Sequence, residues 1–106
     1  MTIPSNIKVI SSYAFYNCNN IRKIIIPDTV EEIQEYAFAN CGAEEMDFSK
    51  SKLTILSNYI CYRMKNLKKV ILPNKLNNLG AHAFGYCYKL ERINLPESIE
   101  KLNSTY

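Results

Sequence analysis

Apolar and polar residues alternate in four short stretches that recur along the chain. These stretches are residues 22–26, 44–48, 68–72 and 92–95. Alternation with a period of two residues is typical of a β-strand that buries one face. A proline directly follows three of the stretches, at Pro27, Pro73 and Pro96, where it ends strand pairing without interrupting it. We therefore expect one half-buried strand in each stretch.

Three further markers repeat at a nearly constant spacing. An apolar residue before proline occurs at residues 3, 26, 72 and 95, with gaps of 23, 46 and 23 residues. An Ala-Phe pair begins at residues 14, 37 and 83, and a cysteine follows each of these phenylalanines three residues later. Repetition at such a period is the signature of a stacked repeat fold. It predicts a single domain with the units 3–25, 26–47, 48–71, 72–94 and a partial unit 95–106.

The third unit departs most from the others. Ile60 and Cys61 replace the Ala-Phe pair, and Met64 replaces the cysteine. The volume lost with the phenylalanine is made up because Ile60 is larger than alanine and Met64 is larger than cysteine. Close-packed interiors resist unmatched changes of volume, and this compensation predicts that all three residues are buried. The second unit is also one residue shorter after Cys41, and the third is one residue longer before Leu53.

The segments "IPDTVEEIQEYAFANC" and "LPNKLNNLGAHAFGYC", with apolar positions at L-x-x-L-x-L spacing closing each unit, resemble the BspA-like leucine-rich repeat. This resemblance implies an α/β fold: a right-handed solenoid with one parallel strand per coil of about 23 residues. It also implies a surface-exposed protein-binding module of microbes. From the residues themselves we expect a second short strand near 30–33 and one helical turn over 35–41.

Composition and charge exclude several classes of protein. The net charge is +3 with basic and acidic residues interleaved, so no basic face suggests nucleic acid or a membrane surface. The longest apolar run, 24–26, is far too short to enter a membrane. Residues 1–12 lack the pattern of a signal peptide, which predicts an intracellular protein or a piece of a longer exported one. The resemblance favours a cell-surface or secreted location.

The four cysteines carry no metal-binding pattern. They are Cys18, Cys41, Cys61 and Cys87. Zinc sites use closely spaced ligand pairs, whereas this chain has no C-x-x-C and a single histidine. Cysteines in one column of a solenoid point the same way, so their Cβ atoms do not converge as a disulfide requires. We expect four free thiols that act as small core residues, and neither a metal nor a cofactor.

The single histidine, His82, precedes an Ala-Phe pair at a position where other units carry Tyr13, Tyr36 and Tyr59. Membership of an aromatic column favours a packing role, and no second acid, base or nucleophile shares its place in the repeat. We therefore expect no enzyme activity. Four other tyrosines should be at least partly exposed, either as contact area for a ligand or as packing between coils: Tyr16, Tyr62, Tyr86 and Tyr88.

The outward positions of the strands form the candidate protein-binding face. Aligned across the units, they make three columns: Arg22, Glu44, Lys68, Glu91; then Lys23, Glu45, Lys69, Arg92; then Ile25, Asp47, Ile71, Asn94. The first column alternates in sign, which favours ion pairs that keep the sheet in register. The same concave surface, with Ile25 and Ile71 exposed, could instead recognise a protein. Both interpretations stay open at this point.

These patterns predict a non-catalytic protein-interaction module of an adhesin-type surface or secreted protein, with a host or matrix protein as its ligand. The alternative is a purely structural spacer in a larger surface protein. The chain stops within a coil, so Ile99 and Leu102 would be core residues with no following coil to cover them. Because solenoids need polar terminal units, we expect self-association through the uncapped ends.

Overall fold

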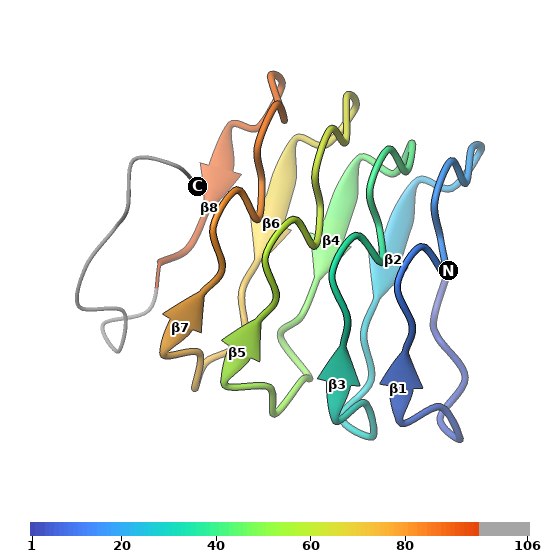
Figure 1. Cartoon of the computed structure of the whole chain (residues 1–106), viewed down its shortest axis with the longest axis vertical. Helices are drawn as coiled ribbons and strands as arrows, with labels where there is room; N and C mark the ends of the chain where they lie inside the picture. Colours follow the sequence, from blue (N-terminus) through green and yellow to red (C-terminus); the bar gives the residue numbers. More distant parts are fainter. Residues whose placement is uncertain (96–106) are drawn as a thin grey trace.

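The computed structural model describes residues 1–95. They wind into a β-solenoid of about four turns, spaced about 23 residues apart (Figure 1). Its strands are β1 (Val9–Ile10), β2 (Lys23–Ile25), β3 (Glu32–Ile33), β4 (Glu45–Asp47), β5 (Ile55–Leu56), β6 (Lys69–Ile71), β7 (Asn78–Leu79) and β8 (Arg92–Ile93). The solenoid and its repeat period are as the sequence predicts.

One side of the solenoid is a continuous parallel sheet with the strand order β2-β4-β6-β8. The central residues of its first three strands, Ile24, Met46 and Val70, are aligned with one another and almost fully buried. Their neighbours on either side are half-buried. This is the inward–outward alternation of a half-buried strand, and it confirms the four predicted strands.

The opposite side carries two separate pairs of short parallel strands, β1-β3 and β5-β7. The strand predicted near residues 30–33 is therefore confirmed as β3. Figure 1 shows the two pairs following each other along the solenoid axis. No pairing joins β3 to β5, although both belong to described and adjacent coils. The sheet on this side is interrupted between the second and third coils.

The leucine-rich-repeat solenoid is as expected, but the helical turn expected over 35–41 is wrong, because residues 1–95 contain strands and turns but no helix. Consecutive tight turns occupy the segment: the N–H of Ala37 donates to the C=O of Gln34, and the N–H of Cys41 to the C=O of Phe38. Tyr36 and Asn40 between them adopt φ of 64° and 59°. Left-handed residues cannot continue a right-handed helix, so the fold is an all-β solenoid.

The interior of the coils is packed as the repeat predicts. Phe38 and Phe84 are buried, and so are the three replacements Ile60, Cys61 and Met64. The N–H of Phe38 donates to the C=O of Ile60 at 2.9 Å, and that of Cys61 to the C=O of Ala83 at 2.8 Å. These bonds place Ile60 and Cys61 between the Ala-Phe pairs of the adjacent coils, which confirms the volume compensation.

The first residues of the chain extend the continuous sheet beyond β2. Thr2 forms a parallel bridge with Ile25, and the N–H of Ile3 donates to the C=O of Ile25. Ile3 is buried, so the chain enters the repeat in register from its third residue. Ile99 and Leu102, whose exposure we expect from the sequence, lie outside the described residues. Among residues 1–95, no helix is long and apolar enough to cross a membrane.

Candidate functional site

The outward positions of the continuous sheet lie side by side, and we call the twelve predicted residues the charged face. Its columns follow the register of the strands: Lys23 is aligned with Glu45, Glu45 with Lys69, and Lys69 with Arg92. A groove of about 600 Å³ runs across them, lined by Arg22, Lys23, Glu44, Glu45, Lys68, Lys69, Glu91 and Arg92. The structure thus brings together the first two predicted columns.

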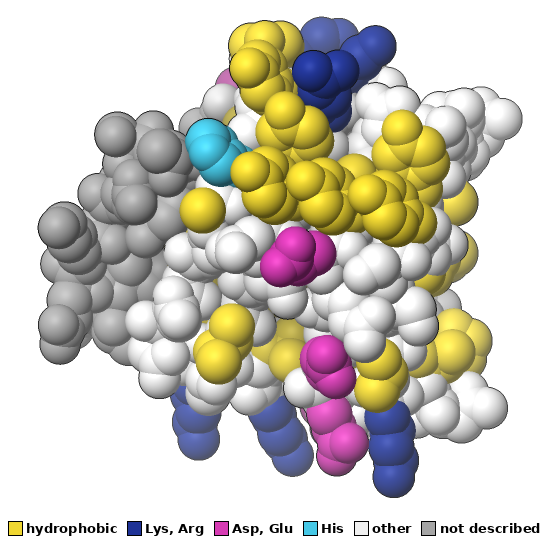
Figure 2. Space-filling view, in the orientation of Figure 1, with side chains coloured by type: hydrophobic (Ala, Val, Ile, Leu, Met, Phe, Trp, Pro, Cys, Tyr) yellow, Lys and Arg dark blue, Asp and Glu magenta, His cyan; other side chains and the backbone are white. Residues whose placement is uncertain are grey.

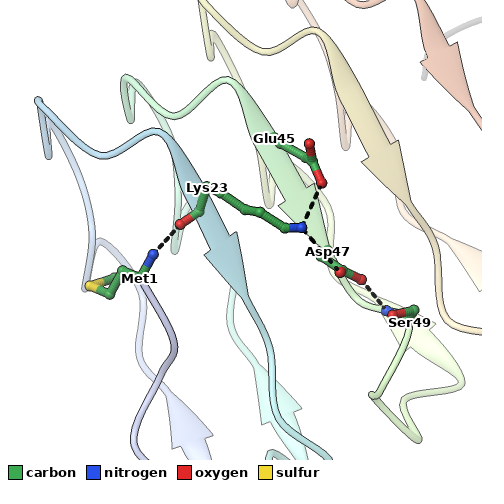
Figure 3. A network of polar contacts seen from close by, with 5 residues as sticks. All are labelled: Met1, Lys23, Glu45, Asp47 and Ser49. Carbon is green, nitrogen blue, oxygen red and sulfur yellow. Dashed lines mark hydrogen bonds and ion pairs between the residues drawn. The ribbon is translucent and has the colours of Figure 1, made fainter.

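Ion pairs hold the half of the charged face that lies over β2 and β4. The Nζ atom of Lys23 lies 3.1 Å from a carboxylate oxygen of Glu45 and 3.9 Å from one of Asp47, as Figure 3 shows. Asp47 also accepts the N–H of Ser49 at 2.8 Å. Partial burial would raise the pKa of Asp47, but the hydrogen bonds from Ser49 and the charge of Lys23 outweigh it, so the pKa lies below its usual value.

In the other half of the charged face, over β6 and β8, positive charges outnumber their ion-pair partners. Lys69 and Arg92 are aligned as direct neighbours on adjacent strands. Within the described residues no carboxylate lies within ion-pair distance of either, although Lys68 beside them pairs with Glu44 at 3.8 Å. Like charges placed directly opposite each other destabilise a sheet. Within residues 1–95, this part of the face therefore presents two cations that form no ion pair.

The third column differs from the expectation. Ile25 and Ile71 are half-buried rather than exposed. Asp47 is aligned between them on β4, and Thr2 covers the other side of Ile25, so neighbouring backbone and side chains shield both. Asn94 uses its side-chain oxygen to accept the N–H of Leu72 at 2.7 Å. This column therefore serves the sheet more than it offers an apolar contact surface.

A second surface, the aromatic ladder, runs along the turns. Tyr13, Tyr36, Tyr59 and His82 stack in sequence with ring centroids 5.2, 4.8 and 5.3 Å apart. Figure 2 shows hydrophobic side chains gathered in a row that leads to the one histidine. All four residues have positive φ, between 54° and 64°. The stack confirms that His82 is a packing residue.

The four remaining tyrosines are partly or largely exposed, as predicted. Tyr16 and Tyr62 make edge-to-face contacts with the ladder and flank a notch of about 220 Å³ over Ala39. Arg63 was missed by the sequence reasoning, and its guanidinium lies 5.4 Å from the ring of Tyr62 and 5.2 Å from that of Tyr86. The sequence did offer one signal: Arg63 stands at the repeat position where the two preceding coils carry Asn17 and Asn40.

The cysteines are suited to packing in the interior and poorly suited to nucleophilic catalysis or metal binding. Cys41 and Cys61 are buried, while Cys18 and Cys87 are half-buried, and all four are free thiols. Burial raises the pKa of Cys41, raises that of Cys61 strongly, and raises that of Cys87 to about 11. A thiol that keeps its proton at neutral pH is a weak nucleophile and a weak metal ligand. Among residues 1–95, no three potential ligand side chains group together to hold a metal ion.

Comparison with known families gives a match along the whole chain. The model of the BspA-type leucine-rich repeat region matches residues 1–106 in six copies. The chain belongs to the BspA-type leucine-rich repeat family. Repeats of this type are common in surface proteins, and leucine-rich repeat solenoids are typically non-catalytic scaffolds. Comparisons with curated proteins and with solved structures found no match.

Proposed function

We propose that this chain is a non-catalytic protein-interaction module and that its charged face binds an acidic segment of a partner protein. The observation that carries the proposal is the aligned pair of cations Lys69 and Arg92, which have no acidic partner among the described residues. A carboxylate placed between them would relieve their repulsion and could accept charge-assisted hydrogen bonds from both.

The shape of the surface supports the same proposal. The groove of about 600 Å³ crosses all four strands, so an extended segment can lie along it and meet several coils. Lys23 and Lys68 already form ion pairs with acidic side chains, which leaves Lys69 and Arg92 as the two cations for which an acidic partner gains most. Complementary charge of this kind sets specificity and the rate of association.

The family membership supports the biological setting of the proposal. BspA-type repeats commonly occur in surface proteins. We place the module in an adhesin-type cell-surface or secreted protein of a microbe, with a host or matrix protein as the ligand. In that setting the repeat supplies a rigid platform, and the side chains on the charged face decide which partner is retained.

A second candidate, the structural spacer, is favoured by the ion pairs on β2 and β4. Lys23 joins Glu45 and Asp47 across adjacent strands, which would hold the register whether or not a ligand binds. Under this alternative another part of a larger surface protein makes the contact. The two candidates differ in whether the charges on β6 and β8 matter for binding.

A charge-reversal experiment separates the two. A fluorescent decapeptide of alternating aspartate and glutamate, and a panel of extracellular matrix proteins, are titrated with the wild type and with the double variant Lys69→Glu/Arg92→Glu. The module predicts that binding weakens by at least about tenfold, or about 1.4 kcal/mol. The matched control is Lys65→Glu/Lys75→Glu, which makes the same change of charge at two exposed residues that do not line the groove. Equal loss in both variants, or no binding by the wild type, contradicts the proposal.

A further inference from the structure

The interruption between β3 and β5 leaves backbone groups without partners on both sides of a groove. Between the first two coils, the N–H groups of Glu31 and Glu32 both donate to the C=O of Lys8. Between the third and fourth coils, those of Asn77 and Asn78 donate in the same way to the C=O of Thr54. No equivalent backbone bond joins the second coil to the third at this level of the described structure.

The direction of the unpaired groups follows from the bonds that are made. Glu32 and Gln34 use their N–H groups toward the first coil, so alternation along a parallel strand turns those of Ile33 toward β5. The C=O groups of Thr54 and Leu56 serve the fourth coil, so the N–H and C=O of Ile55 face β3. Two inner strand edges therefore face each other across the interruption.

The space between the edges has the lining that a strand requires. A groove of about 780 Å³ lies there, and its lining includes Val30, Ile33 and Leu53, which are buried residues at its base. Side chains of both charges also line it: Lys8, Lys52, Asp28, Glu31 and Glu32. The N–H of Ile33 faces this groove and has no partner among the described residues, so it is open to exchange and to a new hydrogen bond.

One side-chain bond closes the far end of the groove. The hydroxyl of Ser57 donates to the C=O of Ile33, in place of the backbone bond that Gly80 makes to Leu56 in the next coil. The opening is therefore at the end formed by Glu31 and Thr54. The extra residue between Phe48 and Leu53 lies in the loop that leads into this end.

We infer that the groove between β3 and β5 is a binding site for an extended peptide, which adds as a strand between the two edges. An apolar residue of the peptide would pack on the base of the groove, and the residues on either side of it would point to solvent. Addition of a strand to an unpaired edge draws its affinity from main-chain hydrogen bonds and its specificity from alternate side chains. This site lies on the side of the solenoid opposite the charged face and is independent of it.

The test uses the whole chain and a capped hexapeptide of alternating valine and threonine. Binding is followed by fluorescence anisotropy, and amide hydrogen exchange of the complex is read at Ile33 and Ile55. We expect both amides to become protected when the peptide binds. A peptide of the same sequence with alternate backbone nitrogens methylated should bind at least about tenfold more weakly, because it cannot donate to one of the edges.

Protein variants give a second, independent readout. Ile55→Pro removes a donor that the free protein does not use and should weaken binding, while Ser57→Ala opens the closed end and should strengthen it. Val9→Pro is the matched control, because Val9 occupies the same place in the first coil and faces away from the second. Equal binding of the methylated peptide, or no protection of Ile33 and Ile55, would overturn the inference. Lys69→Glu/Arg92→Glu should leave this binding unchanged, so failure here is distinct from failure of the charged face.

Discussion

The two sides of this solenoid are made by the same repeats and yet differ in continuity. On the charged side four strands pair without a break, while on the other side the pairing stops between β3 and β5. The repeat changes length once before a strand of each side: one residue is missing after Cys41, ahead of β4, and one is added before Leu53, ahead of β5. The missing residue after Cys41 is absorbed, since the N–H groups of Glu44 and Glu45 donate to the C=O of Arg22 just as those of Lys68 and Lys69 donate to the C=O of Glu44.

The difference teaches where a repeat tolerates a change of length. The second coil lost its residue in the turn region, where β4 is still fixed by the pairing of three aligned residues with β2. The third coil gained its residue just before a strand of only two residues, β5, which has fewer bonds with which to keep its place. A longer strand therefore preserves the sheet, and a shorter one yields a groove.

Loss of the core common to both sides should have the largest effect. Phe38 is fully buried, and replacement by alanine removes its contacts and leaves a cavity, so we expect Phe38→Ala to lower the free energy of unfolding by about 3–5 kcal/mol. Urea denaturation measures this. Phe15→Ala is the control and should cost less, because Phe15 occupies the same position in the first coil but is only half-buried. A loss below about 1 kcal/mol for Phe38→Ala would contradict burial of the column.

The thiols of the same interior should make stability depend on pH. Because the pKa of Cys87 is raised in the folded state, its stabilising contribution is complete below pH 9 and is lost as the pH rises toward 11. The difference between 9.0 and about 11 corresponds to at most about 2.7 kcal/mol. We expect Cys87→Ala to flatten this part of the stability–pH curve. An unchanged stability–pH curve for this variant would show that the Cys87 thiol is accessible to solvent. A separate thiol titration of the wild type in denaturant should find four free thiols, since all four cysteines are unpaired.

A deletion should erase the difference between the two sides. Removing Lys50 restores the normal length of the loop, and we expect β3 and β5 to pair, with a gain of about 1–2 kcal/mol from the new hydrogen bonds. Thermal unfolding measures the gain, and binding of the alternating hexapeptide should disappear. Deletion of Asn74, in the loop of normal length that precedes β7, is the control and should destabilise. Destabilisation by both deletions would contradict the assigned cause of the interruption.

Replacing charged residues of the continuous sheet should change stability least, and the change should be a loss at Lys23 but not at Lys69. Lys23→Ala removes two ion pairs at the surface and should cost less than about 1 kcal/mol, with no cost at high salt. Lys69→Ala relieves repulsion by Arg92 and should leave stability unchanged or slightly higher. Denaturation at low and high salt measures both. A larger loss for Lys69→Ala would show that this residue is paired after all.

The sequence was sufficient for the four strands of the continuous sheet and for the alignment of the first two columns of the charged face. Alternation with period two fixes which side chains point outward, and equal spacing aligns Lys23, Glu45 and Lys69 on successive strands. The turns were not predictable in the same way, because Tyr36 and Asn40 adopt left-handed conformations at positions where no glycine signals them.

The site features that the sequence did not predict depend on contacts between coils. The added residue before Leu53 was visible, but its consequence was not, because only the hydrogen bonds show that β5 leaves β3 unpaired. Arg63 gave no signal beyond its departure from asparagine, and its contact with two tyrosine rings depends on the coil spacing. Lengths and patterns predicted the elements, and three-dimensional packing decided how they meet.

The most direct test of the contrast between the two sides is amide hydrogen exchange of the free protein. Thr54, Ile55 and Ser57 occupy the same repeat positions as Asn77, Asn78 and Gly80, whose N–H groups are hydrogen-bonded to the preceding coil. We predict fast exchange for the first three amides and slow exchange for the second three. Equal protection of the two sets would show that the third coil is paired with the second, and would contradict the interruption on which this account rests.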